Sequence, residues 1–575
     1  MSYITENDRH YIENKYHRTD EAFDPFDRLN YHGYEYDAST GLDDAQMHAA
    51  LEELFEQNRG TDHALAKARG FAFILDHARI DVSQNDWFFG LYNWARPLTK
   101  TFLSKWYTEL FDTMPDVREL MHDYNASGTA ELWLDTEHVV PYWVDILKLG
   151  FPGLLARVRN YHAQCTDLTP KKEAFYQAIE TEYEAILRFL SRLAAYADAH
   201  PGTKSGRIAA SLRTIRDGAP QSTFDALQTM YTYHALSEYV DCYQARSLGN
   251  GLDRSLYAFW KRDIESGTFT RDEIKGFLAY FLLQFSAVGN YWGQPFYLCG
   301  TDYDGKTDIS EWTLDILEVY DSLDLYNPKI QVKINPDTNP KIIDKVLRMI
   351  RAGHTSFVFC CEPGIVKSLM SCYGVTEEEA KNVDISGCNE MHIRGKESCM
   401  ISALPNAAKA IEYVFNDGID GVTGKRLGLA TGDVAKMESF EAFYAAFLKQ
   451  FAHIQVGTGD ISRIGTVLLF VNAHHNIGFD CTYAGAQESC DNQIVKISGG
   501  ITAKTYIFQL LKNRRNFPGH ITHNGADAFF IQVYVGQLSH DIHISSCVPV
   551  GNGCFSVDHQ AVVVGQSQGR AVYIL

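Results

Sequence analysis

The chain has 575 residues, of which 45% are apolar and 13% are aromatic, so it is long and apolar enough to bury a large core. Its formal net charge of -20 argues against binding to nucleic acid or to an anionic membrane surface, because both would repel it. Residues 1–8 are polar and lack the apolar core of a signal peptide, and the most apolar stretch, 277–292, is too short and too polar to span a bilayer. Twelve cysteines without CxxC spacing are typical of reduced thiols, so we expect a cytoplasmic protein.

Helical periodicity dominates the first half of the chain. Residues 1–60 are polar and aromatic-rich, and we expect them to form a largely helical outer segment that includes a helix over 43–56. Beyond them, apolar residues recur at the spacing of one helix face. The longest such pattern ends at His200-Pro201-Gly202, which stops a helix. The clearest predicted helices of this part cover residues 171–199, 223–243 and 271–285.

Strands alternate with helices in the second half. A short apolar run at 294–302 ends in turn residues, 329–335 alternates at period two, and 356–361 is typical of a buried strand. Helical patterns separate or follow them, and this alternation predicts an α/β fold. No internal repeat, low-complexity tract or linker interrupts the sequence, which favours one large domain. The helices expected here cover residues 341–351, 364–373, 376–380, 404–413 and 440–453.

One stretch combines a thiol with a carboxylate. Cys388 follows a glycine, and Glu390 comes two residues later. In an extended segment residues i and i+2 point to the same side, so both side chains could face one cavity. A carboxyl group in a closed, dry cavity titrates nearer to neutral pH, which suits proton transfer. Taken alone, a buried structural cysteine with a surface glutamate nearby explains the pair better.

The surroundings of this pair carry a family resemblance. The matching stretches are residues 138–142, 146–153, 171–176, 299–305, 327–334, 374–380, 387–390 and 407–424. In this order they resemble the pyruvate formate-lyase-like glycyl radical enzymes, in the eliminating branch that carries Gly-Cys-x-Glu. The likeness covers roughly residues 60–510. It implies a polar outer segment at 1–60, a barrel domain at 61–510 and a divergent C-terminal segment at 511–575 without a clear Arg-Val-x-Gly-Tyr motif.

The resemblance implies both a fold and a chemistry. The expected fold is a large α/β barrel of two half-barrels surrounded by helices, with the catalytic cysteine on a central loop. Cys388 would form a thiyl radical that abstracts a substrate hydrogen, and Glu390 would act as general acid or base while a group leaves. The enzyme would be a radical lyase with no directly bound cofactor, activated by a separate S-adenosylmethionine-dependent iron–sulfur enzyme. The family also implies a homodimer.

The radical-bearing glycine is where the sequence departs from the family. The family stores its radical within an Arg-Val-x-Gly-Tyr pattern near the C-terminus, and this chain has none. We favour a separate small subunit that supplies the glycyl radical. Two alternatives remain open: a catalytically silent homologue that acts as a scaffold or binding protein, and a reshaped radical site at Gly565, within Val562 to Ser567.

Three further residues are candidates for binding a substrate. His392 and Arg394 follow the Cys-x-Glu motif and could bind an anionic group such as a carboxylate or sulfonate, although surface contacts explain them at least as well. His138 matches a histidine that reaches the substrate in some members of the family. Residues 398–404 lack the second carboxylate of the diol dehydratases, which argues against diol dehydration. The C-terminal histidines lack the spacing of a metal motif, so no metal is expected.

Overall fold

The computed structural model forms two compact units, residues 1–503 and 504–575, and each is considered by itself. In the second unit, β10 (Ile544–Val550) pairs antiparallel with β11 (Gly553–His559). The three-part division expected from the sequence stays a prediction. The structure describes residues 3–15, 36–92, 94, 98, 101–102, 105–135, 140–240, 248, 251–288, 295–301, 309–386, 390–393, 401–458, 544–550 and 553–559.

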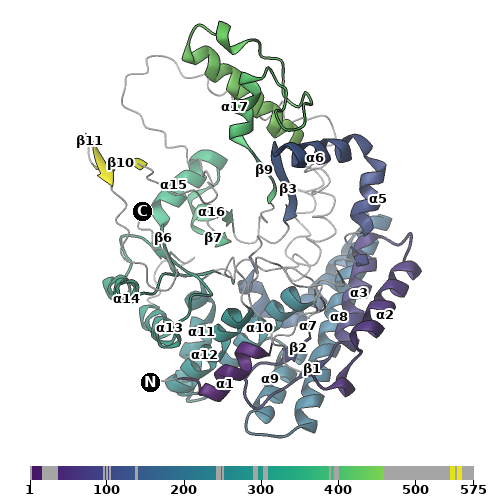
Figure 1. Ribbon diagram of the computed structural model, residues 1–575. Coiled ribbons are helices and arrows are strands. Elements are labelled where there is room, and N and C mark those ends of the chain that lie inside the picture. The colour runs from purple at the N-terminus through teal and green to yellow at the C-terminus, as the bar shows by residue number, and fades with distance from the viewer. Residues whose placement is uncertain are drawn as a thin grey trace. The chain divides into compact units, whose positions relative to one another are not determined.

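Helices make up most of the first unit (Figure 1). They are α1 (Glu6–Asn14), α2 (Asp44–Gln57), α3 (His63–His77), α5 (Lys105–Thr113), α6 (Pro115–Ser127), α7 (Trp143–Gln164), α8 (Pro170–Ala199), α9 (Ser205–Asp217), α10 (Thr223–Tyr239), α11 (Leu252–Ser266), α12 (Arg271–Val288), α13 (Ser310–Leu323), α14 (Pro340–Arg351), α15 (Glu362–Tyr373), α16 (Glu377–Lys381) and α17 (Ala407–Phe415). A further helical segment covers 440–458. Each helix that the sequence predicts is present, with ends shifted by a few residues.

The strands of the first unit form short sheets. Three strands that alternate with helices, β4 (Phe296–Cys299), β5 (Ile330–Ile334) and β6 (Phe357–Cys361), pair in parallel in that order. This arrangement confirms the predicted α/β class; closure of the strands into a barrel stays a prediction. The other pairs are antiparallel: β1 (Ile80–Asp81) with β2 (Gly90–Leu91), β3 (Ala130–Asp135) with β9 (Ile401–Pro405), and β7 (Val383–Ser386) with β8 (Glu390–Ile393).

The long helix α8 shows how the sequence produces the helical part of the fold. The Thr169 hydroxyl accepts a hydrogen bond from the Lys172 amide, and Pro170 at the first helical position has a backbone angle already suited to the helix. The apolar stripe from Ala174 to Ala197 is buried against α3, α7 and α9. The helix ends where the sequence predicts, at His200 before Pro201.

An imidazole bridges α7 and α8. His162 Nδ1 lies 2.8 Å from Glu180 Oε1, and its Nε2 lies 3.0 Å from Glu173 Oε2. The hydrogen bond with Glu180, supported by Glu173, raises the pKa of His162 above its ordinary value. The stabilisation is therefore fully present below about pH 6.5, the ordinary histidine value, and is lost as the pH rises through the raised pKa.

Replacing His162 with glutamine is expected to lower the unfolding temperature at pH 5.5 and to have little effect at pH 9. The loss at pH 5.5 corresponds to about 0.2–1 kcal/mol for each exposed ion pair. Thermal unfolding of the variant and the wild type at both pH values measures it, with His10→Gln, at an exposed position of α1, as the control. An equal loss at pH 9 would instead assign the stabilisation to packing of the neutral ring.

The N-terminal helix is anchored by contacts with distant parts of the chain. The Tyr3 hydroxyl donates to Glu318, 315 positions later, and Arg9 donates to the Leu323 carbonyl. Just past the end of α1, the fully buried Lys15 ammonium lies 2.8 Å from Asp86 Oδ2, which is also fully buried. The start of the described chain is therefore tied to distant elements, with Ile4, Ile12 and Lys15 buried and the intervening Thr5–Asn7 exposed.

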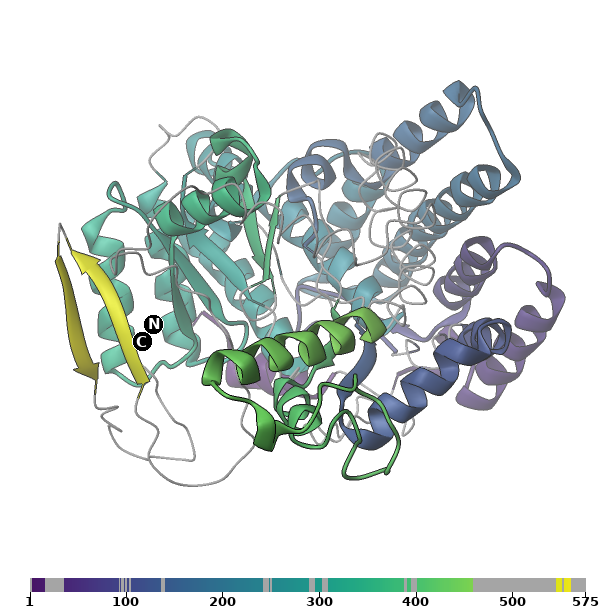
Figure 2. The same cartoon turned by 90° about the horizontal axis from the view of Figure 1, so that it is seen from above.

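A second, smaller core lies where α6 meets α17 and the segment 440–458. Figures 1 and 2 both show the light-green residues 407–458 beside the blue α6. The buried side chains that join them are Tyr124, Ala130, Ala410, Tyr413 and Ile454. This core holds the chain that follows β9 in place.

Candidate functional site

The residues that flank the predicted reaction centre in the sequence form a pair of antiparallel strands, the β7–β8 hairpin. Strand β7 pairs antiparallel with β8 from Val383↔Ile393 to Ser386↔Glu390. Glu390 is therefore the first residue of β8, and the extended backbone that the sequence predicts is present on both sides of the motif. Cys388 falls between the two strands in the sequence and lies outside the described residues.

Polar contacts hold β7 against the parallel sheet. The Tyr297 hydroxyl, on β4, donates a 2.8 Å hydrogen bond to Asp384 Oδ1, and the Lys333 ammonium, on β5, donates to the Val383 carbonyl. The same ammonium lies 3.7 Å from the centre of the Tyr297 ring, a cation–π contact. The side chains of Tyr297, Lys333 and Asp384 are all buried. The hairpin thus rests on two strands of the sheet.

The carboxyl ends of β4, β5 and β6 are tied together by one carboxylate. Glu362 accepts hydrogen bonds from the Thr301 amide and hydroxyl, both at 2.8 Å, and from Asn335 Nδ2 at 2.7 Å. Gly300, which lies between the end of β4 and Thr301, has φ +82°. A Cβ atom at this position would come within 2.9 Å of Lys333 Cδ. Only glycine fits this turn, which is the Cys-Gly-Thr stretch of the family resemblance.

Cys299 has a structural environment. Its amide donates to the buried Asp253, which also accepts from the Thr313 hydroxyl. Burial, reinforced by the Asp253 carboxylate, raises the pKa of the Cys299 thiol well above its usual range. Because the thiolate is the reactive form of cysteine, this thiol is inert toward nucleophilic chemistry at neutral pH.

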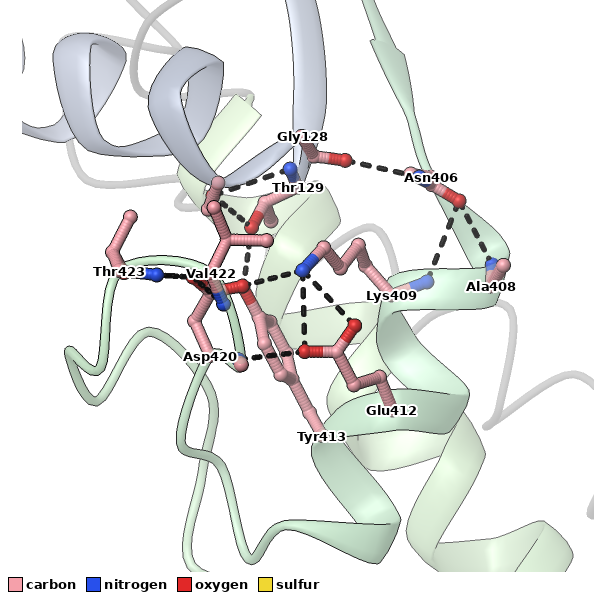
Figure 3. Close-up of polar contacts among 12 residues, drawn as sticks. Gly128, Thr129, Asn406, Ala408, Lys409, Glu412, Tyr413, Asp420, Val422 and Thr423 are labelled. Carbon is pink, nitrogen blue, oxygen red and sulfur yellow. Dashed lines mark hydrogen bonds and ion pairs between the residues drawn. The ribbon is translucent and has the colours of Figure 1, made fainter.

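Beyond the hairpin, a polar network fixes the start of α17 (Figure 3). Asn406 caps the helix by accepting from the Ala408 amide, and it also donates to the Gly128 carbonyl at 3.0 Å. Lys409 pairs with Asp420 at 2.5 Å and with Glu412 at 3.0 Å. The helix and turn that resemble the family at 407–424 thus form a rigid support, joined to the turn after α6.

Asp420 depends on several donors because its side chain is fully buried. Besides Lys409, its carboxylate accepts from the Thr423 amide and hydroxyl at 2.6 and 2.7 Å.

Removing the ammonium with Lys409→Met is expected to lower the free energy of unfolding by about 1.5–3 kcal/mol, the value of a hydrogen bond to a charged group. Urea unfolding measures this change. Lys436→Met, at a side chain that is 83% exposed, serves as the control, and an equal loss there would contradict the role of the buried pair.

Of the other site residues expected from the sequence, two lie on β8 and three lie outside the described residues. Glu390 and His392 lie on β8, where the structure fixes the strand and its register, with His392 opposite Asp384. His138, Arg394 and Gly565 lie outside the described residues, as Cys388 does.

Within the described ranges, no group of three or more His, Cys, Asp or Glu side chains could hold a metal ion. None of the helices in that part of the chain is long and apolar enough to cross a membrane.

Sequence reasoning missed the buried contacts under the hairpin. The period-two pattern of β5 places Gln331 and Lys333 on a polar face, which normally indicates a solvent-facing side. Both side chains are nevertheless buried. The lysine within this short strand is the one local signal that could have pointed to a buried partner.

Comparison with known proteins identifies the family. A family model described as pyruvate formate lyase-like matches residues 107–458, more than half of the chain. The chain belongs to this family. One similar protein is trans-4-hydroxy-L-proline dehydratase of Clostridioides difficile, which is 27% identical over 262 residues. The aligned part covers 43% of this chain and 33% of that protein. Another is (2S)-3-sulfopropanediol dehydratase of Klebsiella oxytoca, 25% identical over 356 residues, or 57% of this chain and 42% of that protein. The chain spans less than half the length of these two relatives.

A solved structure extends the family likeness to the fold. A glycyl radical enzyme from Archaeoglobus fulgidus superimposes with a TM-score of 0.63 at 22% identity, covering 75% of this chain and 63% of the other. At this identity the likeness shows the fold, which is that of a glycyl radical enzyme. The family recognised from the Gly-Cys-x-Glu motif and its neighbours is confirmed.

Proposed function

We propose that this chain is the catalytic large subunit of a glycyl-radical lyase. The observation that carries the proposal is the β7–β8 strand pair in a chain of this family: β8 begins at Glu390, which follows Cys388 by two positions in the sequence. The two relatives with partial coverage are both dehydratases, which supports an elimination reaction. We also propose that the protein works in the cytoplasm.

The proposed reaction begins with hydrogen transfer. A thiyl radical at Cys388 takes a hydrogen atom from a substrate C–H bond, which leaves a thiol and a substrate carbon radical. The neighbouring group then departs, and Glu390 moves the proton that this elimination requires. The product radical takes the hydrogen atom back from the Cys388 thiol, which restores the thiyl radical. No net oxidant or reductant is consumed.

The radical has to reach Cys388 from a glycine. We propose that a small separate subunit carries this glycine, after activation by an S-adenosylmethionine-dependent iron–sulfur enzyme, and that the large chain forms a homodimer. The stretch around Gly565 is the part of this sequence that comes nearest to the family's Arg-Val-x-Gly-Tyr pattern, and it lacks the Arg and the Tyr. A reshaped radical site at Gly565 and a silent scaffold protein are the competing outcomes of the test below.

The proposed substrate carries an anionic group. His392 and Arg394 follow the Cys-x-Glu motif, and His138 matches a substrate-binding position of the family. A guanidinium group binds a carboxylate or sulfonate through paired hydrogen bonds. The names of the two dehydratases contain such compounds: hydroxyproline is a carboxylate and sulfopropanediol a sulfonate. The absence of an acid in 398–404 argues against diol dehydration, so of these two compounds hydroxyproline fits better than sulfopropanediol, which is itself a diol.

Anaerobic reconstitution tests this function. The large chain is mixed with a radical-activating enzyme and a short polypeptide that ends in Arg-Val-x-Gly-Tyr, and the mixture is followed by electron paramagnetic resonance and by turnover of hydroxyproline and sulfopropanediol. We expect a glycyl signal that requires the short polypeptide, and turnover that requires all three components.

Labelling one polypeptide with α-deuterated glycine assigns the radical, because loss of the hydrogen coupling shows which chain carries it. A signal that forms in the large chain alone and disappears in Gly565→Ala would overturn the two-subunit proposal. A stable glycyl signal without turnover of any anionic substrate would favour the scaffold alternative.

A further inference from the structure

The contacts beneath the β7–β8 hairpin meet one strand at adjacent residues from two directions. Lys333, on β5, binds the backbone carbonyl of Val383, and Tyr297, on β4, binds the side chain of Asp384. A single contact would let the strand rotate or slide. Two contacts at successive residues, made by neighbouring strands of one sheet, restrict both motions.

These groups are costly to bury, which argues that they serve more than packing. Lys333, Tyr297 and Asp384 each retain about 1% of their exposure, and a buried ammonium or carboxylate needs partners to offset its desolvation. Apolar side chains of similar volume would fill the same space at a lower cost. The polar groups instead fix one defined placement of β7.

The strand so held leads directly into the proposed reaction centre. Asp384 and Ser386 are two positions apart in β7 and therefore lie on the same face of the strand. Ser386 pairs with Glu390 across the hairpin. Only Ile385 separates Asp384 from Ser386, the last residue of β7, so a displacement of Asp384 is transmitted to Glu390 through the paired backbone. Misplacement of a reacting group by about 1 Å can slow a reaction by roughly a hundredfold.

We propose that Tyr297, Lys333 and Asp384 are positioning residues that set the depth and rotation of the paired strands β7 and β8, and thereby place Glu390, the first residue of β8, against the substrate. This inference rests on the proposed function for its catalytic consequence. Its structural part, the control of the hairpin, is independent of which substrate is used.

The test compares two tyrosine variants that each lose one buried hydroxyl. Tyr297→Phe keeps the ring beside Lys333 and removes the bond to Asp384. Tyr320→Phe removes a buried 2.9 Å bond to the Pro328 carbonyl, away from the hairpin. Amide hydrogen exchange of peptides covering 383–393 and the rate of Cys388 alkylation are measured by mass spectrometry on the complete protein.

We expect exchange over 383–393 to rise about tenfold in Tyr297→Phe, the factor for a lost hydrogen bond to a buried acceptor, and to stay unchanged in Tyr320→Phe. Alkylation of Cys388 should change in the same variant only. In the reconstituted enzyme, kcat should fall by about ten- to a hundredfold while KM and the glycyl signal change little. Asp384→Asn, which keeps an oxygen acceptor for Tyr297, should restore most of the wild-type exchange rate relative to Asp384→Ala.

Unchanged exchange in Tyr297→Phe, or an equal rise in both tyrosine variants, would overturn the inference. If Tyr297→Phe does not fold, the comparison of Asp384→Asn with Asp384→Ala decides the same point. The proposed function has a separate test: it fails if turnover survives loss of the Cys388 thiol. The exchange measurement needs no substrate, so its result does not depend on that test.

Discussion

Replacing Cys388 with alanine is expected to abolish turnover while leaving the glycyl radical signal intact. The thiol is the only group in the proposed site that can relay a hydrogen atom between the glycine and the substrate, and alanine has no weak bond to hydrogen that could replace it. Turnover and spin concentration are measured on the same anaerobic sample, so loss of activity is separated from loss of activation.

The matched control for this experiment is Cys372→Ala, which removes an exposed free thiol near the end of α15. It should retain wild-type turnover, because the chemistry needs one particular sulfur atom. Full activity of Cys388→Ala would remove the basis of the radical mechanism. Loss of the glycyl signal in Cys388→Ala would show that the residue is needed for docking or activation instead.

Glu390→Gln is expected to lower kcat by about a hundred- to ten-thousandfold, the usual contribution of a positioned general acid or base. Glutamine keeps the size and the hydrogen-bonding capacity of the side chain but cannot take up the proton. The pH dependence of the residual activity should lose the limb that reports the carboxyl group. Steady-state rates between pH 5 and 9 measure both effects.

Glu378→Gln on α16 is the control, because this glutamate is exposed and lies before β7 in the chain. It should leave both the rate and the pH profile unchanged. A Glu390→Gln variant with wild-type kcat would mean that another group transfers the proton, and the role proposed for the Cys-x-Glu spacing would be wrong.

The sequence predicts the elements of this protein better than the contacts between them. Strong periodicity and a clear stop signal gave the bounds of α8 within one residue. In contrast, the helix expected over 404–413 begins at Ala407, because residues 401–405 pair with β3 instead. That pairing joins segments about 270 positions apart, and no local pattern indicates it.

In the candidate site, too, the local backbone could be predicted from the sequence, whereas the contacts between distant segments could not. Glu390 lies on extended backbone, as the argument from i, i+2 geometry required, and the prediction that its side chain and that of Cys388 share one side stays a prediction because Cys388 lies outside the described residues. The support beneath it was hidden: 87 positions separate Tyr297 from Asp384, and 50 separate Lys333 from Val383. Local polarity even pointed the wrong way for Lys333, since the desolvation cost of a buried ammonium is offset by groups that only the folded chain brings near.

The anchoring of α1 has a consequence for how the protein is made. Tyr3, just before this helix, is synthesised 315 positions ahead of its partner Glu318. At about 5–20 residues per second, the helix waits roughly 15–60 s with its apolar side uncovered. The contacts that anchor α1 can therefore form only after α12 and α13 have been made.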